Sequence, residues 1–295
     1  MKNKLEKYLE NRFRHNTIRG ITNVIKLYKH WCENENIKIE AANYNDILAY
    51  VNYCKEKGNS KRTLRSKLNC LKHYYEYLRT NQAIEINPII DIRLKNIEKS
   101  AMHAVIKYEE LEKLYQDYPT NGILQKRNKC ILGLLIYQGL NTSELNKLEV
   151  KDIKLEEGKI YIPSTAKSNS RILKLESHQI IQLQNYILSI RPMLLIMTEK
   201  NTDQLFISNG KIGIKNPHNI LAVVKYLLEY LKKMESKIKD VKQIRANIIT
   251  HWLKQYNIRQ VQYMIGHKYV SSTERYSTNK LETLQEQIEK LHPMK

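Results

Sequence analysis

Three short segments follow one another in the last third of the chain: IRANIITHWL at 244–253, VQYMIGH at 261–267 and SSTERY at 271–276. Arg245 lies 22 residues before His267, and His267 lies 9 residues before Tyr276. Apolar residues recur at helical spacing from His178 to the end of the chain. The region that holds the three segments is therefore predicted to be mostly helical.

The first 92 residues show helical patterns only. Ser60 can cap the clearest helix, in which apolar residues recur at 64, 68, 71, 75 and 78. Asn87-Pro88 breaks the helical pattern, and the stretch from Asp91 to Ala104 is polar and basic, with no clear period. We therefore expect a helical domain at 1–92, a linker at 93–104 and a second domain at 105–295.

The period changes within the second domain. A strongly apolar helix around 130–137 ends at Gly139, and two short strand patterns follow at 158–163 and 171–175. The polar residues 164–170 between them form a turn that carries Lys167 at its tip. The sequence thus predicts a mainly α, two-domain fold, with one small antiparallel β-sheet in the second domain.

The chain is strongly basic, with 50 Lys and Arg against 30 Asp and Glu, a net charge of +20. Such a field suits a polyanion: DNA, RNA or an anionic membrane. No run approaches eighteen apolar residues, and the N-terminus MKNKLEKYLENRFRH lacks an apolar signal core. A cytoplasmic protein with no membrane contact is expected.

The helix after Ser60 is the first candidate for DNA binding. No acidic residue occurs between Asn59 and His73, and such a cationic helix can neutralise phosphates. An ordinary solvated face is the alternative interpretation. The candidate residues are Lys61, Arg62, Arg65 and Lys67.

The cysteines point to neither a metal site nor disulfides. All four lie far apart and no CxxC pair occurs, so free thiols in a reducing compartment are expected. They are Cys32, Cys54, Cys70 and Cys130.

The ordered segments resemble the signature of the tyrosine site-specific recombinases, the phage integrase family. That family shows an Arg at the opening of a helix, a Gly-His some twenty residues later, and a Tyr nine residues after the His. Residues 130–153, which end in GLNTSELNKLEVKDI, look like its first catalytic box. Residues 1–92 look like its helical, SAM-like core-binding domain, including the closing Asn-Pro. The resemblance covers nearly the whole chain.

The resemblance implies a set of catalytic roles. Tyr276 would attack a DNA phosphodiester and form a 3′-phosphotyrosine, which stores the bond energy so that no metal or cofactor is needed. Arg245 would clamp the phosphate with its planar guanidinium. Lys167 would protonate the leaving 5′-oxygen. His267 would donate to the phosphate or accept from the tyrosine. Each is a common structural residue when considered alone, and only the joint register favours these roles.

Two positions depart from the family pattern. Asn141 stands where the first box has Arg, and Lys242 stands where a His normally precedes the second Arg by three residues. The loss of one transition-state donor typically costs about 2.7–4 kcal/mol. Arg127 could supply the missing charge, but on a continuous helix it would lie about 21 Å from Asn141 along the axis. It could help only if the chain bends sharply, and otherwise it is a surface residue.

The segment from Leu281 to His292 is amphipathic, with Leu281, Leu284, Ile288 and Leu291 on one stripe. It could pack on its own domain. The resemblance implies instead that it docks on a neighbouring subunit, in a homo-tetramer on double-stranded DNA with a specific recombination site.

Three interpretations remain open. The first is an active site-specific recombinase, the integrase or transposase of a mobile element. The second is a catalytically impaired relative that acts as a DNA-binding regulatory or architectural protein, which the changes at Asn141 and Lys242 favour. An active recombinase is favoured by the retention of four residues of the family pattern: Arg245, Lys167, His267 and Tyr276. A helix-turn-helix repressor, the third, leaves the hairpin and the ordered boxes unexplained, and the length and N-terminal domain oppose a type IB topoisomerase.

Overall fold

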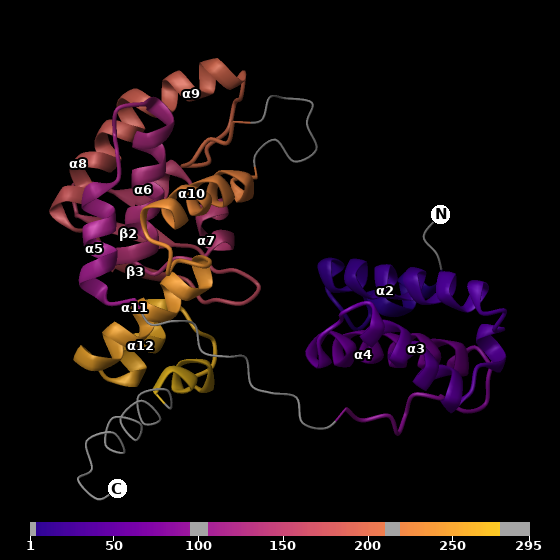
Figure 1. Cartoon of the computed structure of the whole chain (residues 1–295). Coiled ribbons are helices and arrows are strands. Elements are labelled where there is room, and N and C mark those ends of the chain that lie inside the picture. Colours follow the sequence, from indigo (N-terminus) through magenta and orange to yellow (C-terminus); the bar gives the residue numbers. More distant parts are fainter. Residues whose placement is uncertain (1–3, 95–105, 210–218, 278–295) are drawn as a thin grey trace, which may run out of the picture. The chain divides into compact units, whose positions relative to one another are not determined.

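The computed structural model of the chain describes residues 4–94, 106–209 and 219–277 (Figure 1). It divides into two compact units, Met1–Ala101 and Met102–Lys295. Most of the expected linker and the whole amphipathic segment Leu281–His292 lie outside the described residues.

All secondary-structure elements in the described residues of the N-terminal unit are helical. Its elements are α1 (Lys4–Glu10), α2 (His15–Asn34), a 3₁₀ turn (Ile39–Ala41), α3 (Tyr44–Glu56) and α4 (Lys61–Thr80). The predicted cap of α4 is confirmed, because the Ser60 hydroxyl accepts from the backbone N–H of Thr63 at 3.2 Å. Helix α2 packs on α4, where the buried hydroxyls of Tyr28 and Tyr75 lie 2.7 Å apart.

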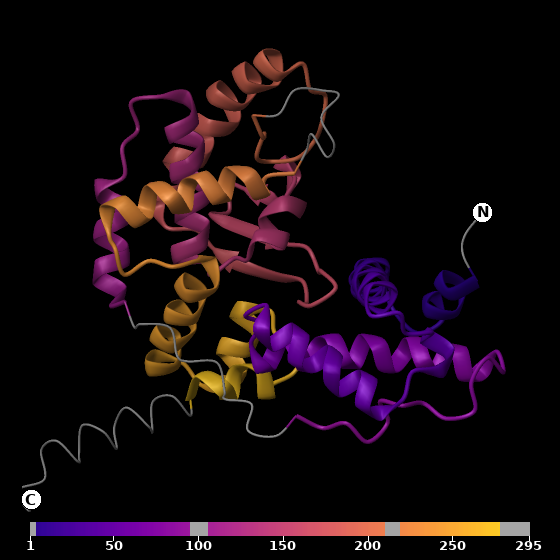
Figure 2. The same ribbon diagram turned by 45° about the vertical axis from the view of Figure 1, so that its right-hand side comes forward.

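The second unit places helices around a small sheet (Figure 2). Its helices are α5 (Tyr108–Asp117), α6 (Ile123–Tyr137), α7 (Thr142–Lys147), α8 (Ser177–Asn185), α9 (Arg191–Thr198), α10 (Leu221–Met234), α11 (Val241–Gln255) and α12 (Ile258–Ile265). A 3₁₀ turn (Val150–Asp152) follows α7, a π-helical turn (Tyr186–Ile190) joins α8 to α9, and residues 271–277 are helical.

The sheet has three antiparallel strands in the order β1-β2-β3: β1 (Ile153–Lys154), β2 (Lys159–Ile162) and β3 (Arg171–Lys174). The mainly α fold class and the hairpin are thus confirmed. The first strand was not predicted, because two residues are too few to show an alternating pattern.

Helix α6 forms the centre of the second unit. Every residue from Lys129 to Ile136 is buried, because α5, α8, α10 and α11 all pack against this helix. The chain leaves α6 through Gly139, whose φ of +58° is a conformation that glycine adopts readily. This turn brings the start of α7 close to α11, where the candidate site lies.

The continuous helix Ser177–Thr198 contains an 18-residue window with a mean hydropathy of 1.3, so it is long and apolar enough to cross a membrane by length and composition alone. Its inner face, with Leu183, Tyr186, Ile190 and Leu194, is buried in the core of the second unit. Packing in the folded domain therefore accounts for the apolar character of that face.

Candidate active site

A buried cluster of three charged side chains lies where α7, β3 and α11 meet. Arg171 holds Glu144 with two hydrogen bonds, Nη1 to Oε1 at 2.8 Å and Nη2 to Oε2 at 3.2 Å. Arg245 donates to the same carboxylate, Nη1 to Oε2 at 3.2 Å. The side chains of Arg171 and Glu144 are fully buried, whereas that of Arg245 is 12% exposed. Of the three, only Arg245 therefore faces solvent.

Asn141 places the carboxylate of this cluster. It is the N-cap of α7, and its side-chain oxygen accepts from the backbone N–H groups of Ser143 and Glu144 at 2.9 and 3.0 Å. Glu144 returns the interaction by accepting from the backbone N–H of Asn141 at 2.9 Å, a capping box. The residue at the first-Arg position thus serves the helix start, a role for which asparagine is among the best residues.

The two arginines also tie the end of α12 to the cluster. Arg171 donates through Nε to the carbonyl of Met264 at 2.7 Å. Arg245 donates to the carbonyls of Ile265, at 2.6 Å, and Gly139. Gly266 follows with a φ of +75°, and a Cβ there would collide with the guanidinium of Arg171. Both the backbone conformation and the close approach of Arg171 therefore require glycine before His267.

The charges of the cluster stabilise one another. Burial alone would raise the pKa of Glu144, but hydrogen bonds and charges from Arg171 and Arg245 hold it below its usual value. Burial lowers the pKa of Arg245, and the charge of Glu144 opposes that shift. Removing one partner from a buried pair typically costs about 3–5 kcal/mol, because the other charge stays buried.

The β2–β3 hairpin is attached to the turn that carries His267. Ser168 forms an antiparallel backbone bridge with His267, and the N–H of Asn169 donates to the carbonyl of Gly266 at 2.9 Å. The N–H of Lys167 donates to the hydroxyl of Thr165 at 3.2 Å, and the residue itself is exposed. The loop therefore holds the backbone of Lys167 beside the Gly266-His267 turn.

His267 and Tyr276 lie together on the other side of this turn. Their ring centroids are 6.2 Å apart and the planes are 18° from parallel. The buried hydroxyl of Thr273 lies 2.9 Å from Nδ1 of His267. Burial and the positive charges of Arg245 and Arg171 lower the pKa of His267 to about 4, so the imidazole is neutral at physiological pH. Tyr276 is partly buried and packs against the hydrophobic core of the second unit.

The remaining candidates from the sequence lie at different places. Lys242 is exposed in the first turn of α11, one turn before Arg245. Arg127 is neither in the cluster nor on the surface, because it is only 2% exposed. Its guanidinium donates to the carbonyl of Ile207 at 2.7 Å and to the side chain of Asn209, and burial lowers its pKa to about 10. The described contacts of Arg127 therefore give it no part in the cluster.

Three residues of this arrangement were not selected from the sequence: Arg171, Glu144 and Thr273. Glu144 lies in the segment 130–153 that resembles the family's first catalytic box, and Thr273 lies in the segment 271–276 that ends at Tyr276. Both residues therefore belong to motifs that the sequence had already indicated. Arg171 had no such signal, since a basic residue at the start of an exposed-looking strand is common. Only its long-range contacts show that it belongs to the site.

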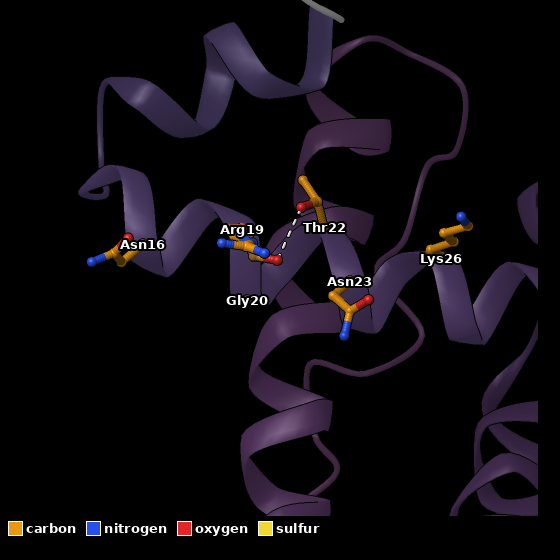
Figure 3. Close-up of a pocket in the computed structure, with 6 residues that line it drawn as sticks. All are labelled: Asn16, Arg19, Gly20, Thr22, Asn23 and Lys26. Carbon is orange, nitrogen blue, oxygen red and sulfur yellow. Dashed lines mark hydrogen bonds between the residues drawn. The ribbon is translucent and has the colours of Figure 1, made fainter. Parts of the chain in front are cut away.

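The N-terminal unit presents a separate cationic surface. Lys61, Arg62 and Arg65 are exposed on α4, whereas half-buried Lys67 points its ammonium toward the sulfur of Cys54 at 3.5 Å. The outer face of α2 has an open polar hollow (Figure 3). Its lining residues are Asn16, Arg19, Gly20, Thr22, Asn23 and Lys26. Amides and cations of this kind suit a phosphate backbone better than an apolar ligand.

Comparison with known protein families gives two matches. Residues 104–282 match the phage integrase family, and residues 4–82 match the phage integrase N-terminal SAM-like domain. The tyrosine recombinase XerC of Oceanobacillus iheyensis is 24% identical over 279 residues, covering 94% of this chain and 90% of that protein. XerC of Thermodesulfovibrio yellowstonii is 27% identical over 281 residues, with the same coverage.

Solved structures share the fold. The integrase of transposon Tn1549, in complex with a circular intermediate DNA, has a TM-score of 0.68 at 17% identity, covering 96% of this chain and 98% of that one. A lambda integrase dimer bound to a core site has a TM-score of 0.63 at 14% identity, covering 92% of both chains.

Proposed function

The chain belongs to the phage integrase family, and on that premise we propose that it is a site-specific DNA recombinase that cuts and rejoins DNA through a 3′-phosphotyrosine at Tyr276. The observation that supports the proposal is the pairing of the His267 and Tyr276 rings, whose centroids are 6.2 Å apart. Arg245 supports it as well, because it donates to the carbonyl of Ile265, two residues before His267.

Each group has a distinct task in this mechanism. The Tyr276 oxygen attacks the phosphorus and loses its proton, while the 5′-oxygen leaves with a proton from Lys167. Arg245, with Lys242 one turn before it, offsets the extra negative charge of the five-coordinate phosphorus. Neutral His267 donates to a phosphate oxygen or accepts from the phenol. Rejoining reverses these steps with a 5′-hydroxyl from another strand.

The alternative is a catalytically impaired protein that binds DNA as a regulatory or architectural factor. The position of Asn141 favours it, since the side-chain oxygen is occupied by the α7 cap and an amide carries no charge for the phosphate. Against this alternative, a protein that only binds DNA has little use for Lys167, Arg245, His267 and Tyr276 in register.

We further propose that the partner is double-stranded DNA with a specific recombination site, bound in the cytoplasm by a homo-tetramer. The exposed cations of α4 support contact with phosphates. The structures of the Tn1549 and lambda integrases named above were solved with DNA bound. The amphipathic segment Leu281–His292 would link neighbouring subunits by tail exchange. The fold shared with a transposon integrase supports a role in a mobile element, as an integrase or transposase.

The test is covalent capture of DNA. The protein would be incubated with a library of nicked duplexes that are randomised around the nick, so that the short fragment diffuses away and traps the cut state. An active enzyme yields a protein–DNA adduct on a denaturing gel, and Tyr276→Phe yields none. If wild-type protein retains selected duplexes on a native gel but never forms the adduct, the binding-only alternative holds.

A further inference from the structure

The starting observation is the charge balance of the buried cluster. Glu144 is fully buried and contacts both arginines. Arg171 is equally buried and donates three hydrogen bonds, two to Glu144 and one to the carbonyl of Met264. Two positive charges and one negative charge leave a net charge of +1. Because Arg171 itself is fully buried, it does not reach a DNA phosphate in this arrangement.

We propose that Arg171 is a positioning residue for DNA cleavage. It neutralises Glu144, so that the positive charge of Arg245 is not cancelled and its guanidinium stays oriented for the phosphate. This inference rests on the proposed function. With Arg171 present, Glu144 shares its single negative charge between two guanidinium groups, so it offsets the charge of Arg245 only in part. Without Arg171, Glu144 would bind Arg245 alone and cancel its charge where the phosphate must bind.

The hydrogen bonds of Arg245 fit this division of work. A guanidinium has five N–H groups, and the described residues engage three of those on Arg245, through Gly139, Glu144 and Ile265. The two others, Nε–H and one Nη2–H, have no described partner. A carboxylate freed from Arg171 could rotate toward them, and the same two donors would be needed for the phosphate.

Arg171 also fixes the turn that carries His267. It donates to the carbonyl of Met264 and fills the space beneath Gly266, so it sets where α12 ends. The hairpin residue Asn169 joins the same turn, because its backbone N–H donates to the carbonyl of Gly266 at 2.9 Å. The Arg171 side chain thus contacts the turn before His267 directly and is linked to Arg245 through Glu144.

The charge argument can be separated from a structural role by two paired substitutions. Arg171→Met changes the cluster charge from +1 to 0, and Arg171→Met with Glu144→Gln restores it to +1 while leaving an oxygen that can accept from Arg245. We expect Arg171→Met to lower the rate of adduct formation about 10²-fold. The double variant should recover to within about tenfold of wild type, and Arg171→Lys should also retain part of the rate.

A second readout does not depend on activity. The titration of the His267 ring can be followed by NMR in the free protein, where Arg171 and Glu144 act on it with opposite sign. Arg171→Met should raise the pKa of His267, because it removes a positive charge that acts on the ring, and the double variant should return it toward the wild-type value. Arg191→Met is the control, because Arg191 donates to the backbone carbonyls of Thr202 and Gln204. It should leave both the rate and the His267 titration unchanged.

The outcomes separate the two proposals. If wild-type protein forms no adduct, the proposed function fails, and the titration still decides whether Arg171 neutralises Glu144. If wild type cleaves but the double variant is as slow as Arg171→Met, and the His267 titration is the same in all variants, the inference is overturned. Equal losses in the Lys and Met variants that follow a fall in melting temperature would also overturn it, by showing a structural role only.

Discussion

Ser168 and His267 are joined by an antiparallel backbone bridge, which fastens the hairpin to the end of α12 although the two residues come from distant parts of the sequence. Lys167 immediately precedes Ser168 in the chain, and its backbone N–H donates a hydrogen bond to the hydroxyl of Thr165. The fold thus fixes the backbone of the expected general acid while its side chain remains exposed.

Lys167→Ala should slow cleavage about 10²–10⁴-fold, the usual contribution of a general acid. The defect should largely disappear on a duplex whose 5′-bridging oxygen is replaced by sulfur, because a thiol leaves as the anion far more readily than an alcohol. Single-turnover cleavage of the two substrates gives the comparison. An equal loss on both substrates would mean that Lys167 does not protonate the leaving group.

Thr273→Val should lower the cleavage rate about fivefold, since the loss of a hydrogen bond worth about 1 kcal/mol leaves the ring of His267 less well held. The two side chains have the same shape, and the hydroxyl is buried, so the substitution tests the bond to Nδ1 of His267. Thr198→Val is the matched control, because it removes a buried bond to the carbonyl of Leu194 away from the cluster. Equal rates in Thr273→Val and wild type would contradict the role.

Asn141→Arg should raise the cleavage rate, by up to about 10²-fold, because it returns a guanidinium to the position where the family has one. It should also lower stability by about 0.5–2 kcal/mol, since arginine cannot cap α7 as asparagine does. Denaturant unfolding and single-turnover cleavage measure the two effects. Asn141→Asp keeps the cap without adding a cation. It should therefore show neither the faster cleavage nor the loss of stability. A rate unchanged by Asn141→Arg would show that the site does not lack that charge.

The pH dependence of stability follows from His267. Its pKa is depressed in the folded protein to about 4, below the ordinary value of about 6.5 that holds in the unfolded chain. The unfolded state therefore binds a proton first as the pH falls, and stability should decline from about pH 6.5 to pH 4. His267→Gln should flatten this part of the curve in urea titrations. An unchanged slope in the variant would assign the decline to other groups.

The α4 cations should control the salt dependence of DNA binding. Replacing Lys61, Arg62 and Arg65 with Ala should weaken affinity for all duplexes and lower the slope of log K against log salt by about 0.9 for each phosphate that the variant no longer neutralises. Lys67→Ala should have less effect, because its ammonium is directed toward Cys54. The control, Ala at exposed Lys38, Lys55 and Lys57, removes equal charge from other parts of the same unit. If this control lowers the slope as much, α4 has no special role.

Local patterns in the sequence were enough to predict the helix after Ser60, the helix around 130–137 and the hairpin, whereas α1 and α7 were not predicted individually. Periodic apolar residues and turn chemistry act over a few neighbours, so their structural result can be inferred without knowing the rest of the fold. The apolar run around 130–137 predicted the helix that became α6 in the same way. The two residues of β1 form a strand only because β2 lies beside them.

The tertiary structure decided which charges meet. Arg171 and Glu144 are 27 positions apart and pair in the core, whereas Arg127, an equally plausible cation from its type alone, is buried against Ile207. A buried charge is stable only where partners converge on it through space, and sequence spacing does not encode that convergence. The order of Arg245, His267 and Tyr276 was thus determined by the sequence itself, and the electrostatic surroundings of Arg245 by the packing of α7, β3 and α12.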